Sequence, residues 1–142
     1  MNNTISPFHL AIPVTDLRRA EHFYGSVLGC SKGRFSEQWI DWNFFGHQLV
    51  THCVAEMPSS PAHNAVDNKS VPVPHFGVVL SMQDWQSLAQ RLTEAQVKFV
   101  IEPYIRFKGE VGEQATMFFT DPSGNALEFK AFADITQLFE MD

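Results

Sequence analysis

The stretch FHLAIPV at residues 8–14 decides the fold, because a similar stretch, PHFGVVL, recurs at residues 74–80. Both have the composition of a short β-strand, and both carry histidine at the second position. Each is followed by apolar residues at helical spacing, over residues 17–28 and 85–95. Three strand-like segments then follow in each half. The order strand, helix and three strands therefore occurs twice, which predicts an α+β fold built on an internal repeat.

The predicted boundaries follow from this repeat and from the turn residues between its parts. The later strands are expected at residues 31–36, 39–45 and 48–54 in the first half, and at 97–107, 116–120 and 125–132 in the second. Four prolines within residues 57–74 favour a loop between the halves. We expect one domain over residues 1–142, with module one at about 7–56, a linker at about 57–74, module two at about 75–132 and a tail at 133–142.

Composition excludes several classes of protein. The chain has 142 residues, 44% hydrophobic and 18% charged, which is typical of a globular domain with a real core. The net charge of −6 argues against a nucleic-acid binder. The sequence contains no apolar run of membrane-spanning length and no signal-peptide pattern. Two cysteines are too few for a disulfide scaffold, so we expect a cytoplasmic protein with reduced thiols.

The strand pattern places three potential metal ligands on corresponding faces. Side chains alternate along a strand, so His9 points away from the face that carries Leu10 and Ile12. The same argument turns His75 away from the apolar face of the second repeat. Glu128 lies between the core residues of the last strand and points to the opposite face. Two imidazoles and one carboxylate form the facial set that holds a divalent metal and leaves coordination positions open.

Four segments carry a resemblance to a known family. They are FHLAIPVTDL at 8–17, FYGSVLGC at 23–30, PHFG at 74–77 and DPSGNALEF at 121–129. With them the chain resembles the vicinal oxygen chelate superfamily, which includes glyoxalase I, extradiol dioxygenases and bleomycin-resistance proteins. The resemblance implies two βαβββ modules whose curved mixed sheets form a cup around a metal. It also implies that His9, His75 and Glu128 occupy the metal-ligand positions.

One departure from the family bears on the reaction. The resemblance implies that glyoxalase I adds a fourth ligand, a glutamate on the last strand of the first half. Aligning Gly46 with Gly124 makes Val50 the counterpart of Glu128, so this carboxylate is missing. A three-ligand site fits the extradiol type better. There the resemblance implies Fe(II) or Mn(II) as the metal, with Zn, Ni or Co as alternatives.

Other polar residues near the expected cup are candidates for catalysis and substrate binding. His52 is a candidate acid/base, with a fourth metal ligand or a solvent-facing histidine as the alternatives. Gln48 shares its face and is assigned to the substrate or, in a lyase, to the metal. Tyr104 is a candidate hydrogen-bond donor to the substrate. Arg106 and Lys108 are candidate cations for a substrate carboxylate.

Three functions follow from this interpretation. The first is extradiol-dioxygenase-like chemistry on a small oxygen-chelating substrate. The second is a glyoxalase-like lyase or isomerase, and the third is a bleomycin-resistance-type protein that binds a drug without catalysis. The expected partner is a small molecule, with neither nucleic acid nor membrane involved. A single-chain cup and a homodimer are equally compatible with the sequence.

Overall fold

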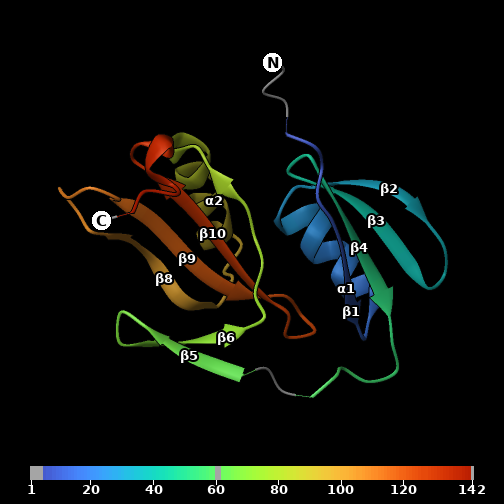
Figure 1. Ribbon diagram of the computed structural model, residues 1–142. Coiled ribbons are helices and arrows are strands. Elements are labelled where there is room, and N and C mark those ends of the chain that lie inside the picture. Colours follow the sequence, from blue (N-terminus) through green and yellow to red (C-terminus); the bar gives the residue numbers. More distant parts are fainter. Residues whose placement is uncertain (1–4, 60–61, 142) are drawn as a thin grey trace. The chain divides into compact units, whose positions relative to one another are not determined.

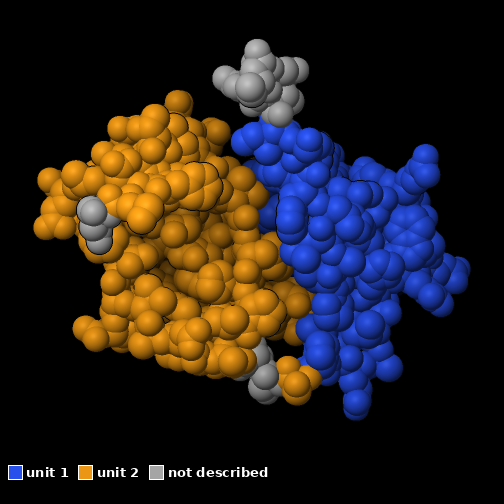
Figure 2. Space-filling view, in the orientation of Figure 1, with its two compact units in different colours: residues 1–58 blue, residues 59–142 orange. Residues whose placement is uncertain are grey.

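The computed structural model describes residues 5–59 and 62–141. The chain divides into two compact units, residues 1–58 and 59–142 (Figure 2). Each unit contains one βαβββ-like module with a mixed sheet, as Figure 1 shows. Residues 60 and 61 of the expected linker, and the chain ends 1–4 and 142, lie outside the described residues. Within the described part, no helix is long and apolar enough to cross a membrane.

The sheet of unit 1 has the strand order β1-β4-β3-β2. Its strands are β1 (His9–Val14), β2 (Ser31–Phe35), β3 (Trp39–Phe44) and β4 (His47–Cys53). β1 runs parallel to β4, and the other neighbours are antiparallel. One face of this sheet carries buried side chains, among them Ile12, Leu49 and Trp42. His9 is on the opposite, exposed face of β1, as the alternation predicts.

The helix predicted at residues 17–28 forms, but it changes its geometry part-way. It starts as α1 (Leu17–Glu21), whose first amide groups donate to the side chain of Asp16. It continues as a π-helix, η1 (His22–Val27), in which the amide of Leu28 reaches back to the carbonyl of Phe23. Gly25 lies here against Trp42, because a Cβ atom at this glycine would be 3.3 Å from the indole ring. The wider helix therefore accompanies close helix–sheet packing.

Unit 2 repeats the arrangement with the strand order β7-β10-β9-β8. Its elements are β7 (Val79–Leu80), α2 (Met82–Glu94), β8 (Phe99–Arg106), β9 (Gln114–Thr120) and β10 (Ala126–Phe132). Ser81 caps α2 by accepting a hydrogen bond from the amide of Asp84 at 3.1 Å. α2 covers one face of the sheet (Figure 1), where Trp85 Nε1 donates to the carbonyl of Phe129 at 2.9 Å.

The turn before β10 explains the DPSGN segment of the sequence. Asp121 is buried, and one of its carboxylate oxygens accepts from the amides of Ser123 and Asn125, at 2.9 Å each. The other oxygen accepts from the side-chain amide of Asn125 at 2.9 Å. Gly124 has φ of 90°, which a residue with a side chain rarely adopts. This turn sets where β10 starts and therefore which face Glu128 occupies.

Strand register relates the two modules residue by residue. In unit 1, His9 pairs with Gln48 and Ala11 pairs with Val50. In unit 2, Phe76 forms a bridge with Leu127, and Val79 pairs with Lys130. The same register places Gly77 opposite Glu128. Val50 and Glu128 therefore hold equivalent positions, in agreement with the alignment of the two glycine turns.

The expected linker contains a β-hairpin, which corrects the prediction of a loop. Its strands are β5 (Ala62–Val66) and β6 (Lys69–Val73), joined by Asp67 and Asn68. These two residues have φ of 50° and 62°, the left-handed conformation of a two-residue hairpin turn. Proline signals were misleading because a two-stranded ribbon has only edge strands, where a missing N–H donor is tolerated.

Two further segments differ from expectation. The strand predicted at residues 74–80 is reduced to β7 and the single bridge at Phe76. The predicted tail at residues 133–142 contains a short 3₁₀ helix, Ile135–Gln137. Phe139, however, is 88% exposed, so it does not pack on the sheet of unit 2.

Candidate functional site

His75 and Glu128 meet on the open face of the unit 2 sheet. His75 Nε2 lies 3.3 Å from Glu128 Oε1. The second carboxylate oxygen, Oε2, accepts a hydrogen bond from the hydroxyl of Thr116 at 2.5 Å. Thr116 is on β9 and is buried, and the Glu128 side chain is 15% exposed. Two of the three predicted metal ligands are therefore brought together.

The ring of His75 has a defined orientation. Its Nδ1 is 2.7 Å from the carbonyl oxygen of Pro72. A carbonyl only accepts, so Nδ1 carries the hydrogen and donates it, and Nε2 is the nitrogen that faces Glu128. Phe118 packs edge-to-face on the imidazole at 4.7 Å between ring centroids. A lone pair that faces a carboxylate oxygen needs a proton or a cation between them.

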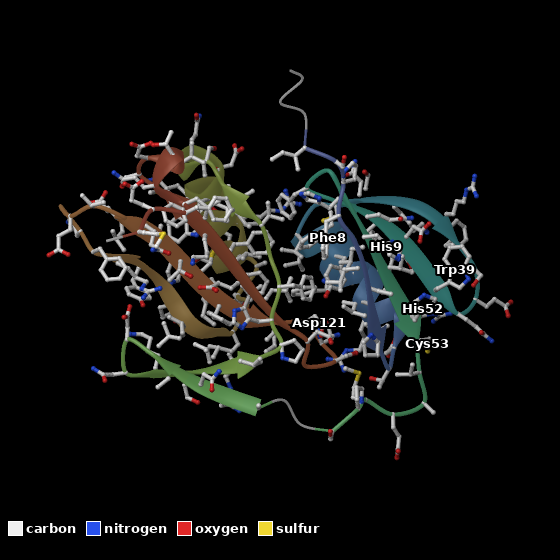
Figure 3. All side chains as sticks on the ribbon, viewed as in Figure 1. Phe8, His9, Trp39, His52, Cys53 and Asp121 are labelled. Atoms are coloured by element: carbon white, nitrogen blue, oxygen red, sulfur yellow. The ribbon has the colours of Figure 1, made fainter. Side chains whose placement is uncertain are left out.

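His9 has the same tautomer, fixed by a different pair of residues. His9 and His52 come from the neighbouring strands β1 and β4 of unit 1 (Figure 3). Asp41 Oδ2 accepts from the Gln48 amide nitrogen at 3.5 Å, which turns the amide oxygen toward His9. That oxygen is 2.8 Å from His9 Nδ1 and must accept its hydrogen. His9 Nε2 is thereby left as the free, lone-pair-bearing nitrogen.

Glu128 and His75 form one wall of a cavity of about 160 Å³ within unit 2. Its polar lining consists of His75, Tyr104, Arg106, Thr116, Glu128 and Lys130, and its apolar lining of Val66, Val71, Ile101 and Phe118. The hairpin β5–β6 contributes two of the apolar residues. His75 lies between β6 and β7, and β8, β9 and β10 of the sheet contribute the other lining residues. A pocket with an apolar wall and a few convergent polar groups is the usual form of a small-molecule site.

The hairpin is held beside β8 by one aspartate at its turn. Asp67 Oδ2 accepts from the hydroxyl of Tyr104 at 3.0 Å, and Oδ1 accepts from Arg106 Nη2 at 3.2 Å. The hydrogen bond from Arg106 is the main reason that the pKa of Asp67 lies below its ordinary range. Burial raises the pKa of Tyr104, and the hydrogen bond to Asp67 adds to this effect. We call Asp67, Tyr104 and Arg106 the hairpin latch.

The hairpin latch is expected to open when Asp67 loses its charge. A lowered pKa in the folded state means that Asp67 stabilises the fold above its unfolded pKa of about 4, and that this contribution disappears as the pH falls through the lower folded value. We therefore expect Asp67→Asn at neutral pH to accelerate amide hydrogen exchange across residues 62–73 several-fold. Mass spectrometry of the exchanged protein measures this directly.

A matched variant separates the latch from a general loss of stability. Asp84→Asn changes an exposed aspartate of α2 in the same unit and should leave exchange in the hairpin unchanged. Wild-type protein at a pH below the lowered pKa of Asp67 should lose protection of the hairpin to the same extent as Asp67→Asn, once both are corrected for the pH dependence of intrinsic exchange. Equal exchange in wild type and Asp67→Asn at neutral pH would contradict the latch.

The other predicted site residues lie as follows. Tyr104 and Arg106 line the cavity, with their polar groups engaged by Asp67. Lys108 is exposed in the turn after β8. His52 is exposed on β4, opposite Trp39 on β3. Their roles in catalysis or substrate binding stay predictions.

Three residues of the candidate site were not predicted from the sequence. Thr116 and Lys130 face the cavity beside Glu128, and strand alternation alone contains the signal for both. Asp67 has no such signal, since it contacts residues 37 and 39 positions away. Across residues 5–59 and 62–141, no three His, Cys, Asp or Glu side chains gather into a set able to hold a metal ion.

Comparison with known families decides where this chain belongs. The model of the "Glyoxalase/Bleomycin resistance protein/Dioxygenase superfamily" matches residues 6–129. The chain belongs to this superfamily. The family suggested by the sequence motifs is therefore confirmed, and members of the superfamily often bind a divalent metal. A search of the curated proteins finds no match.

Solved structures of the superfamily share the fold over almost the whole chain. A glyoxalase/bleomycin resistance protein/dioxygenase from Alicyclobacillus acidocaldarius is 33% identical, with a TM-score of 0.76, over 97% of this chain and 99% of that one. A genomically encoded fosfomycin resistance protein from Listeria monocytogenes is 14% identical, with a TM-score of 0.67, over 96% and 98%. A glyoxalase/dioxygenase from Nostoc punctiforme is 17% identical, with a TM-score of 0.67, over 94% and 99%. The last two share the fold alone.

Proposed function

We propose that this member of the superfamily is a metal-dependent enzyme in which His9, His75 and Glu128 bind one divalent cation. The observation that carries the proposal is the shared state of the two histidines. Each donates its Nδ1 hydrogen to an oxygen, from Gln48 for His9 and from Pro72 for His75. Metal-binding histidines almost always anchor their second nitrogen in this way, which leaves the other nitrogen free for the metal.

The donor set fits a divalent metal on chemical grounds. The 3.3 Å between His75 Nε2 and Glu128 Oε1 is close to the roughly 3 Å between neighbouring ligands whose bonds to a metal are about 2.1 Å long. Two histidines and one carboxylate favour Fe(II). Val50 stands at the position equivalent to Glu128, so β4 adds no carboxylate there, which supports a three-ligand site over the four-ligand glyoxalase type.

We further propose ring-cleaving dioxygenase chemistry on a small diol as the reaction. A bound divalent metal supplies Lewis acidity and holds the two substrate oxygens in place. The chain contributes an apolar wall, with Ile101 and Phe118 almost fully buried. A cavity of about 160 Å³ suits one six-membered ring, since an engineered cavity of about 150 Å³ binds benzene. His52 is the proposed acid/base for proton transfers at the diol.

The test is oxygen uptake with catechol as the probe. Protein reconstituted anaerobically with Fe(II) is mixed with catechol and O2 in an oxygen electrode, and the molecular mass of the product is measured by mass spectrometry. The expected result is one O2 consumed per catechol, with both oxygen atoms in a single ring-opened product. His52→Gln should lower turnover by about 10²–10⁴-fold, the range of general acid–base catalysis.

Three outcomes distinguish this proposal from its rivals. Oxygen uptake that is unchanged by His75→Ala would contradict the proposed site. If the protein binds Zn or Ni and isomerises a glutathione hemithioacetal, it is a glyoxalase-like lyase and not a dioxygenase. If the protein takes up no metal and binds bleomycin tightly, it is a drug-binding protein and not an enzyme.

A further inference from the structure

We propose that Lys130 binds an anionic group of the substrate, so that the substrate class is a single-ring vicinal diol that carries a carboxylate. This inference rests on the proposed function and adds the charge of the substrate to it. It concerns only the cavity of unit 2, whose lining is described above. It moves the role of substrate cation from Arg106 and Lys108, where the sequence pattern suggested it, to β10.

Lys130 lies on the same strand as the proposed metal ligand Glu128. It follows Glu128 by two residues on β10, so both side chains point to the same face of the sheet. Its strand neighbours are Thr116 on β9 and Val79 on β7. Lys130 lines the cavity together with Glu128 and His75. Two strand residues span roughly 7 Å, about the distance from a diol at one side of a benzene ring to a carboxylate at the other.

The charged groups within the cavity differ in whether they are compensated. Arg106 is compensated, because Asp67 accepts a hydrogen bond from it and forms an ion pair with it. Glu128 faces His75. For Lys130, by contrast, no acidic side chain in the described part of the chain lies within ion-pair distance. Its ammonium group lies over the ring of Phe132, with the ring centroid 5.7 Å from Nζ.

This cation is not part of a generally basic surface. The chain has a net charge of −6, yet this half-buried lysine stands uncompensated in an apolar-walled cavity. A half-buried ammonium without a partner is costly, and a carboxylate supplied by a ligand would satisfy it. An anionic diol would meet both features of the cavity: its oxygens would face Glu128 and His75, and its carboxylate would face Lys130.

The test compares two probes that differ only in the carboxylate. Protein loaded with Mn(II) under anaerobic conditions is titrated calorimetrically with catechol and with protocatechuate, which is catechol bearing one carboxylate. Wild type is expected to bind protocatechuate about tenfold or more tightly than catechol, in the range of charge-assisted hydrogen bonds. Lys130→Met should abolish this preference and leave the affinity for catechol within about twofold.

Controls make the two proposals separable. Lys98→Met removes an exposed lysine of the same unit and should keep the preference of wild type. Lys130→Gln, which retains a polar end, should lose the preference as Lys130→Met does. If wild type binds both probes equally, or Lys130→Met keeps the preference, the role of Lys130 is overturned while the metal proposal stands. If wild type takes up Mn(II) and binds neither probe, or takes up no Mn(II), the proposed function fails first.

Discussion

Gly77→Ala is expected to destabilise unit 2 by more than about 3 kcal/mol and to lower the melting temperature of the protein by about 10 °C or more. A Cβ atom at residue 77 would lie 1.6 Å from the carbonyl oxygen of Glu128 and 2.6 Å from its carbonyl carbon. The obstacle is backbone and cannot rotate away. The amide of Glu128 also donates to the carbonyl of Phe76 at 2.8 Å, so both strands must separate to admit a methyl group.

Urea unfolding followed by circular dichroism, with hydrogen exchange at residues 126–132, measures the effect of Gly77→Ala. Gly33→Ala is the matched control in a strand. A Cβ atom there would be 3.4 Å from the Cβ of Asp41, which is a contact at the tight end of the ordinary range, and the change should alter stability by no more than about 1 kcal/mol. Equal stability of Gly77→Ala and Gly33→Ala would contradict the close approach of the two strands.

Glu128→Gln is expected to lower the affinity for Mn(II) or Fe(II) by more than about a hundredfold. The change keeps the shape of the side chain and removes the negative charge that faces His75. Loss of a residue that only supports a ligand costs about 10–100-fold, so loss of a ligand should cost more. Anaerobic metal titration measures the affinity, and thermal unfolding of the metal-free protein checks that the fold is kept.

Variants of residues that hydrogen-bond to the proposed ligands provide comparisons for the metal affinity of Glu128→Gln. Thr116→Val removes the hydroxyl that donates to Glu128, and Gln48→Leu removes the amide oxygen that accepts from His9. Each should weaken metal binding by about 10–100-fold. Glu102→Gln, on an exposed position of β8, should leave it unchanged. A Glu128→Gln protein that binds metal as tightly as Thr116→Val would contradict its role as a ligand.

Sequence reasoning succeeded where a local pattern sets the structure. Alternation along two strands placed His75 and Glu128 on one face, and their side chains are 3.3 Å apart. The same alternation placed His9 on the exposed face of β1, and turn glycines gave the equivalence of Val50 and Glu128. These features depend on strand parity and register, which a repeated motif reveals.

The features that escaped prediction depend on contacts between distant residues. From sequence, Arg106 was expected to be a free cation, because its partner Asp67 lies 39 residues earlier. Asp67 belongs to a hairpin that was not predicted, since the prolines indicated a loop. The shift from α- to π-helix accompanies the packing of Gly25 on Trp42, again across elements. Lys130 shares the face of Glu128, but only the compensation of Arg106 by Asp67 distinguishes it as the uncompensated cation of the cavity.

The most direct test of the account is the metal content of the protein purified without oxygen, measured by elemental analysis beside His9→Ala and His75→Ala. His9 belongs to unit 1 and His75 to unit 2, so the comparison asks whether both units supply ligands. We predict about one Fe or Mn per wild-type chain and less than about a tenth of that in either variant. Full occupancy in His9→Ala or in His75→Ala would contradict the three-ligand site.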